Sequence, residues 1–168
     1  MPGTGIILRS MIADDWAIVR SIYLDGVATG EATFETAAPS WKQWDTAHLP
    51  APRLIAAAEE LVIGWAALSP ISARAVYSGV AEVSVYVATA SRGQGVGRAL
   101  LERLVEESEN YGIWTLQASI FPENVASIGI HKSCGFREVG TREGIGKKDG
   151  IWRDTRLLER RSRSVGSD

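Results

Sequence analysis

Three glycines lie within five residues, at Gly93, Gly95 and Gly97, and they separate two segments of different periodicity. Before them, residues 82–87 alternate valine with other side chains, which predicts a strand with one buried face. After them, residues 99–111 carry apolar side chains at helical spacing and end at a glycine, which predicts a helix with a glycine stop. The chain is therefore expected to contain a strand, a glycine turn and a helix in that order.

The rest of the sequence continues this alternation of strands and helices, which predicts an α/β fold. Further strands are expected at 6–9, 54–58, 61–68, 114–120, 136–139 and 152–158, with a hairpin turn at Glu59-Glu60. Further helices are expected at 14–23, from a Ser40 cap across Trp41 and Trp44, and at 124–134. Residues 26–39 are expected to be irregular.

Length and composition narrow the class of protein. The 168 residues predict one domain at 1–159, followed by a basic, serine-rich tail at 160–168 that is expected to be disordered. The net charge of −2 predicts no nucleic-acid partner. One cysteine and two histidines predict no metal site. We see no leader segment and no long apolar run, so we expect no membrane partner and a cytoplasmic location.

The glycine segment also predicts a phosphate-bearing ligand. Glycine lets the backbone approach a ligand closely, and free amides at a helix start favour an anion. A turn with no ligand is the alternative, but it needs only one glycine. No Lys-Ser/Thr pair follows the glycines, which argues against a P-loop. The spacing and the late position in the chain argue against a dinucleotide fingerprint.

The segment Arg92-x-x-Gly95-x-Gly97 resembles the acetyl-CoA pyrophosphate loop of the GCN5-related N-acetyltransferase (GNAT) superfamily. A second family block is similar to residues 124–131, followed by Gly135-Phe136. Together the likeness extends over nearly the whole chain, from residue 6 to about residue 158. It implies a single domain with a mixed central β-sheet flanked by helices, acetyl-CoA as the cosubstrate, and a homodimer.

Within that superfamily, the chain resembles the phosphinothricin and methionine sulfoximine N-acetyltransferases. The segments that carry this resemblance are 32–35, 74–77, 81–87 and 146–154. It implies transfer of an acetyl group from acetyl-CoA to the amino group of a small amino-acid-like molecule, by direct attack. Phosphinothricin, methionine sulfoximine and methionine sulfone are acceptors of this type.

The same resemblance assigns the cofactor-binding residues. The pyrophosphate is expected at the loop formed by Arg92, Gly93, Gln94, Gly95, Val96, Gly97 and Arg98. The backbone of Val85, Tyr86 and Val87 is expected to pair with the pantetheine arm and to polarise the thioester oxygen. Asn124 is expected to bond the pantetheine amide, with Ser127 in support. Asn124 also suits a helix N-cap, which is the structural alternative.

Two side chains are expected to move protons. Glu82 is the expected general base, which would accept the ammonium proton of the acceptor directly or through water. His131 is the expected donor of a proton to the departing thiolate. The structural alternatives are an exposed strand carboxylate and a helix histidine with no catalytic role. Cys134 is interpreted as a small packing residue, because the resemblance implies direct transfer without a cysteine nucleophile.

The acceptor is expected to contact Phe34, Arg74, Tyr77, Glu82 and Ser84. Arginine binds a carboxylate with two parallel hydrogen bonds, so Arg74 is the expected partner of an acceptor carboxylate. Phe34 and Tyr77 would wall the pocket. Two aromatic core residues and a solvated arginine are the structural alternative.

Two other functions fit the same motifs. One is acetylation of a protein N-terminus or a ribosomal protein, which needs an open groove for a peptide. The other is an acyl-CoA-binding sensor without catalysis, which would retain the glycines but would need neither Glu82 nor His131.

Overall fold

A computed structural model describes residues 5–168 and confirms the α/β fold. Within this range, seven strands form one mixed sheet in the order β1-β2-β3-β4-β5-β7-β6. The strands are β1 (Ile6–Ser10), β2 (Arg53–Ala58), β3 (Leu61–Pro70), β4 (Val80–Val87), β5 (Thr115–Ile120), β6 (Arg137–Lys148) and β7 (Ile151–Arg161). The helices are α1 (Trp16–Thr29), α2 (Trp41–Ala47), α3 (Val96–Asn110) and α4 (Val125–Ser133), with short 3-10 helices η1 (Ala13–Asp15), η2 (Ala75–Tyr77) and η3 (Thr89–Ser91). Residues 1–4 of the predicted domain lie outside the described residues.

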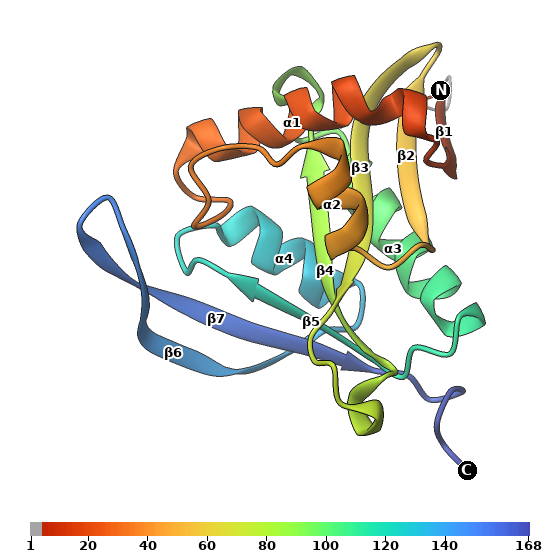
Figure 1. The fold of residues 1–168 in the computed structure, drawn as a ribbon, viewed down its shortest axis with the longest axis vertical. Coiled ribbons are helices and arrows are strands. Elements are labelled where there is room, and N and C mark those ends of the chain that lie inside the picture. The colour runs from red at the N-terminus through yellow and green to blue at the C-terminus, as the bar shows by residue number, and fades with distance from the viewer. Residues whose placement is uncertain (1–4) are drawn as a thin grey trace.

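Helices cover both faces of the sheet (Figure 1). On one face, α1 and α2 bury Val19, Ile22 and Trp44 against β2 and β3. On the other face, α3 buries a leucine stripe that includes Leu100 and Leu104. Both helical stripes face the sheet because their apolar residues recur at helical spacing. The glycine loop at the start of α3 is therefore held against a packed core.

β4 and β5 are parallel but pair over only three positions. The pairs are Val80 with Thr115, Ala81 with Leu116, and Glu82 with Gln117. On its other edge, β4 pairs with β3 from Ala81 to Val87. The edge of β4 that faces β5 is consequently free of strand partners beyond Glu82, which opens the middle of the sheet.

Two helices are longer than the sequence predicts. α1 continues through Gly26 to Thr29, so the predicted irregular segment begins later than expected. Gly26 is required there because a Cβ atom would lie 2.7 Å from the Tyr86 ring. Gly30 ends the helix in a left-handed conformation with φ +74. α3 begins at Val96, directly after the glycine turn, rather than at residue 99.

The C-terminal hairpin differs most from the prediction. β6 and β7 extend far beyond 136–139 and 152–158, and Figure 1 shows the hairpin projecting past the other strands. The prediction of a disordered tail at 160–168 is wrong for its first residues. Arg161 ends β7 opposite Thr115, and the buried Ser162 hydroxyl donates to Glu109 at 2.8 Å. These residues are ordered because β7 lies inside the sheet, between β5 and β6.

Three other features of residues 5–168 bear on the sequence predictions. No helix in this range is long and apolar enough to cross a membrane. No group of three or more His, Cys, Asp or Glu side chains in the same range could hold a metal ion. Cys134 is half-buried and packs against the main core cluster, as expected for a packing residue. Burial raises the pKa of its thiol, which lowers its reactivity at neutral pH.

Candidate active site

Two cavities meet beside β4, where that strand separates from β5. The first, of about 330 Å³, lies between β4 and β5, and the second, of about 570 Å³, lies over the glycine loop. Both fall in the size range of small-molecule sites. The two cavities share six lining residues: Ala32, Val85, Tyr86, Asn124, Ser127 and His131. They are therefore adjoining halves of one site, which we call the acceptor cavity and the loop cavity.

The loop cavity is built on the glycine turn. Gly93 and Gly95 have φ values of +74 and +83, a region that favours glycine. Gly95 is the N-cap of α3, and having no side chain it leaves the first amides of the helix open to the cavity. Gly97 also lines the cavity, and a Cβ atom there would be in ordinary van der Waals contact with Ile130 of α4, at 3.4 Å. Open amides and a helix dipole of this kind favour the binding of an anion.

The structure brings most of the predicted loop residues to this cavity. Arg92, Gly93, Gly95, Val96, Gly97 and Arg98 line it, as do the predicted strand residues Val85, Tyr86 and Val87. Gln94 does not line it, because its side-chain amide turns back to donate to the Ala90 carbonyl at 3.3 Å. Two exposed arginines flank the bare helix amides, and their charge suits a pyrophosphate.

The free edge of β4 continues from one cavity to the other. Val85 and Tyr86 line both cavities, and Val87 lines the loop cavity. The Tyr86 ring is fixed by stacking on Trp65 at a centroid distance of 4.9 Å. Burial raises the pKa of the Tyr86 phenol, so the phenol is neutral at physiological pH. Backbone groups of an unpaired strand edge can bond an extended ligand in the manner of an added strand.

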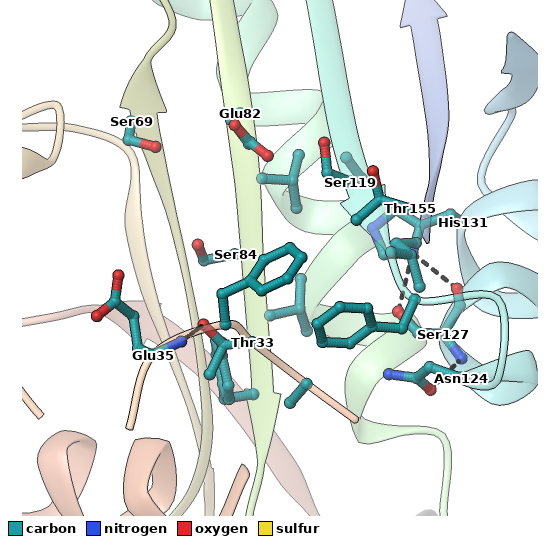
Figure 2. Close-up of a pocket in the computed structure, with 18 residues that line it drawn as sticks. Thr33, Glu35, Ser69, Glu82, Ser84, Ser119, Asn124, Ser127, His131 and Thr155 are labelled. Carbon is teal, nitrogen blue, oxygen red and sulfur yellow. Dashed lines mark hydrogen bonds between the residues drawn. The ribbon is translucent and has the colours of Figure 1, made fainter. Parts of the chain in front are cut away.

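The acceptor cavity is lined by carboxylates, hydroxyls and aromatic rings. The predicted residues Phe34, Glu82 and Ser84 all line it. The polar residues that sequence reasoning missed are Thr33, Glu35, Ser69, Ser119 and Thr155. Figure 2 shows the Glu82 carboxylate extending from β4 toward the side of the cavity where Ser119 lies. The 32–35 segment was a signal for Thr33 and Glu35, whereas the other three lie on separate strands without a motif.

The C-terminal hairpin holds one wall of the acceptor cavity in place. The buried Lys148 ammonium donates to the Thr33 carbonyl at 2.5 Å. Phe34 packs edge-on against Phe121, with ring centroids 4.8 Å apart. A Cβ atom at Gly146 would lie 2.9 Å from the Phe34 ring, so this glycine is required for the close approach of β6. The hairpin therefore positions residues 33–34.

Asn124, Ser127 and His131 lie on the opposite side of the cavity from Thr33 and Glu35 (Figure 2). Asn124 is the N-cap of α4, since its side-chain oxygen accepts from the Ser127 amide at 3.2 Å. His131 lies one helical turn beyond Ser127, and its Nδ1 is 2.7 Å from the Ser127 carbonyl oxygen. Burial lowers the pKa of His131, and the bond to Ser127 only partly offsets this effect. The imidazole is therefore neutral at pH 7.

Arg74 and Tyr77 are not brought into the site. Both are exposed on or beside η2, where the Arg74 guanidinium lies 5.4 Å from the Tyr77 ring centroid. Neither lines the acceptor cavity, whose lining includes Glu35 and Glu82 but no lysine or arginine. The lining of the acceptor cavity thus contains carboxylates that could accept the proton of an acceptor ammonium. It contains no lysine or arginine that could pair with an acceptor carboxylate.

Comparisons with known proteins agree with this geometry. The family model described as the acetyltransferase (GNAT) family matches residues 16–136. A phosphinothricin N-acetyltransferase from Alcaligenes faecalis is 35% identical in an alignment of 160 positions that covers 91% of this chain and 81% of the relative. An L-methionine sulfoximine/L-methionine sulfone acetyltransferase from Pseudomonas aeruginosa is 31% identical over 160 residues, which are 95% of this chain and 87% of the relative.

Solved structures of acetyltransferases also share the fold of this chain. The phosphinothricin acetyltransferase from Sinorhizobium meliloti, in complex with acetyl-CoA, has a TM-score of 0.88 at 30% identity, covering 98% of this chain and 92% of that one. A ribosomal-protein-alanine N-acetyltransferase from Brucella melitensis has a TM-score of 0.86 at 31% identity, covering 93% of this chain and 99% of that one.

Proposed function

The chain belongs to the acetyltransferase (GNAT) family and is an acetyl-CoA-dependent N-acetyltransferase, and on this premise we propose that its acceptor is a small amino-acid-like amine of the phosphinothricin, methionine sulfoximine or methionine sulfone type. One observation carries the proposal. The loop cavity and the acceptor cavity share six lining residues, so a thioester and an amine bound in them would meet. Holding two reactants together is itself a large part of catalysis.

The loop cavity suits acetyl-CoA. The pyrophosphate would lie at the bare amides of Gly95–Arg98, beside the exposed guanidinium groups of Arg92 and Arg98. The pantetheine arm would run along the free edge of β4, with Asn124 and Ser127 at its side. A backbone amide of Val85–Val87 would donate to the thioester oxygen and stabilise the negative charge that develops on it.

The acceptor cavity provides the proton acceptor for the amine. An acceptor ammonium has no lone pair, so it must lose a proton before it attacks. Glu82 lines the cavity at the last pair of β4 with β5, and we assign it this step, directly or through water. The neutral amine then attacks the thioester carbonyl, the new C–N bond forms, and the C–S bond breaks to release the thiolate of CoA.

The proposed acceptor contacts are Phe34, Ser84 and Glu82, which line the cavity. Arg74 is retained as the proposed partner of the acceptor carboxylate and Tyr77 as a proposed wall of the pocket, although neither lines the cavity. Because the cavity lining holds no lysine or arginine, this carboxylate would have to extend out of the cavity to reach Arg74. A second candidate function is acetylation of a protein N-terminal alanine, which the name of the Brucella melitensis structure favours.

The proposal is tested by incubating a panel of amines with acetyl-CoA and measuring the release of the CoA thiol. The panel contains methionine sulfoximine, methionine sulfone, phosphinothricin, the parent amino acids and a peptide that begins with alanine. We expect turnover with members of the sulfoximine, sulfone and phosphinate group. Turnover with the peptide alone would establish the second candidate function. If the protein binds CoA but none of the amines causes release of the CoA thiol, both candidate functions are overturned.

We also propose a homodimer, joined along β6. This strand is at the edge of the sheet, and the hairpin exposes Ile145, Ile151 and Trp152 to the extent of 52%, 65% and 64%. Ile145 lies on the edge strand itself and the other two lie on β7 next to the hairpin turn, and exposed apolar side chains at a sheet edge are typical of an interface. Light scattering coupled to gel filtration should give twice the chain mass, and Trp152→Ser should shift the protein toward the monomer. A monomeric parent protein would contradict the proposal.

A further inference from the structure

The imidazole of His131 is held in one tautomer. Its Nδ1 lies 2.7 Å from the Ser127 carbonyl oxygen, and a carbonyl can only accept a hydrogen bond. Nδ1 therefore carries the hydrogen of the neutral ring, and the lone pair is on Nε2. His131 is 5% exposed, and its ring packs edge-on against Phe136 at a centroid distance of 5.1 Å, which fixes its orientation.

This tautomer leaves Nε2 as the nitrogen of His131 that can exchange a proton at the junction of the two cavities. His131 lines both cavities, so its free nitrogen is the atom available to a reactant. Burial keeps the ring neutral at pH 7 by lowering its pKa. A neutral ring with a bare Nε2 can accept a proton there, and it has none to donate at that atom. The charged and titratable groups that line the cavities with it are Glu31, Glu35, Glu82, Tyr86, Arg92 and Arg98.

We propose that His131 is a proton relay within a single turnover, accepting a proton from the attacking nitrogen through Nε2 and then donating the same proton to the sulfur of CoA. The inference rests on the proposed function. It keeps the expected role of His131 as the donor of a proton to the departing thiolate, and it adds where that proton comes from.

The relay balances the reaction. The acceptor ammonium loses its first proton to Glu82, which passes it to water. As the amine attacks, its nitrogen becomes positively charged, and Nε2 of His131 takes the second proton. The C–S bond then breaks, the sulfur leaves with the electron pair, and the protonated imidazole returns its proton to the thiolate. The products are the amide, the CoA thiol and one proton in solution, with His131 neutral again.

The tautomer can be measured without any substrate. The chain has two histidines, so a long-range ¹H–¹⁵N spectrum contains only two imidazoles, which His131→Asn assigns. We expect His131 to have a protonated Nδ1, a bare Nε2 and a pKa below the usual 6.5. His48 is an internal reference, since its Nδ1 lies 2.7 Å from the Trp44 carbonyl oxygen outside both cavities. A proton on Nε2 of neutral His131 would overturn the relay even if acetyl transfer is established.

The pH dependence of kcat/KM gives the second test. For a relay, the rate falls as the pH drops through the pKa measured by NMR, because protonated His131 cannot accept. For a pre-protonated acid, the rate falls as the pH rises through the same pKa. We expect the acidic fall to persist in Glu82→Gln and to vanish in His131→Asn, which keeps a donor to the Ser127 carbonyl and should lose about 10²-fold in rate. His48→Asn should retain the parent profile. A rate that falls with rising pH through this pKa would contradict the relay.

Discussion

Glu82 of β4 lies opposite Gln117 of β5 in the last residue pair that joins these two parallel strands. Beyond this pair the strands separate, and the acceptor cavity occupies the space between them. The carboxylate that we assign as the general base is thus placed by sheet topology at the inner end of the cavity. The backbone that would hold the thioester follows within the next five residues of the same strand.

Glu82→Gln should lower kcat by about 10²–10⁴-fold at neutral pH, because the amide keeps the shape of the side chain but cannot accept the ammonium proton. Affinity for acetyl-CoA, measured by calorimetry, should be unchanged. Glu35→Gln, which alters the other carboxylate of the cavity, is the matched control and should have a much smaller effect on kcat. Equal losses in the two variants would remove the special role of Glu82.

The prediction from sequence succeeded where a local pattern has a physical cause. The glycine turn, the Ser40 cap and the alternation of 82–87 each determine the conformation of their own segment, and the structure contains all three. Only the beginning of β6 and the middle of β7 were predicted as strand. The rest of β6 was not, because Gly140, Gly144 and Gly146 interrupt the strand pattern. The pairing of β6 with β7 shifts register at 138–140 and 142–146, so no regular alternation is present to detect.

The acceptor side of the site was less predictable for a different reason. Ser69, Ser119 and Thr155 come together because β3, β5 and β7 converge on one cavity, and a serine or threonine on a strand has no signature of its own. Arg74 was selected for its chemistry, and the structure places it outside the lining. The cofactor side was predictable because one continuous segment forms most of it.

Gly95→Ala should weaken acetyl-CoA binding about tenfold. A φ of +83 costs an alanine about 1–2 kcal/mol, so the turn would relax and displace the helix amides. Gly112→Ala is the control, because Gly112 has a similar φ of +75, open space around its Cβ position and no contact with either cavity. It should lower the melting temperature by a similar amount without changing the Kd measured by calorimetry. Equal affinities in the two variants would contradict the anion site.

Lys148→Met should raise the KM for the acceptor several-fold while leaving the KM for acetyl-CoA nearly unchanged. The substitution leaves the Thr33 carbonyl without its charged donor, at a cost of about 1–3 kcal/mol, and loosens the wall that carries Phe34. Lys147→Met changes the exposed neighbour, whose ammonium lies over the Trp152 ring, and should leave both constants unchanged. A Lys148 variant with parental kinetics would show that the hairpin does not position the cavity wall.

Arg74→Ala tests whether an exposed arginine outside the cavity binds the acceptor carboxylate. Loss of a hydrogen-bonded ion pair of this kind should raise the acceptor KM about tenfold or more, with kcat less affected. The effect should be absent for an acceptor amine that lacks a carboxylate, which is a control within the same enzyme. If the two acceptors respond equally, or if neither responds, Arg74 has no role in carboxylate binding.

Isotopic labelling tests whether the acetyl group passes directly from the loop cavity to the acceptor cavity. The protein is incubated with acetyl-CoA labelled with ¹³C in its acetyl group and with methionine sulfoximine, and small molecules and intact protein are then analysed by mass spectrometry. We expect label on the amino nitrogen of the acceptor, and no labelled protein when the acceptor is left out. Labelled protein without acceptor, with the acetyl group on Cys134, or an acceptor that never gains the label, would contradict it.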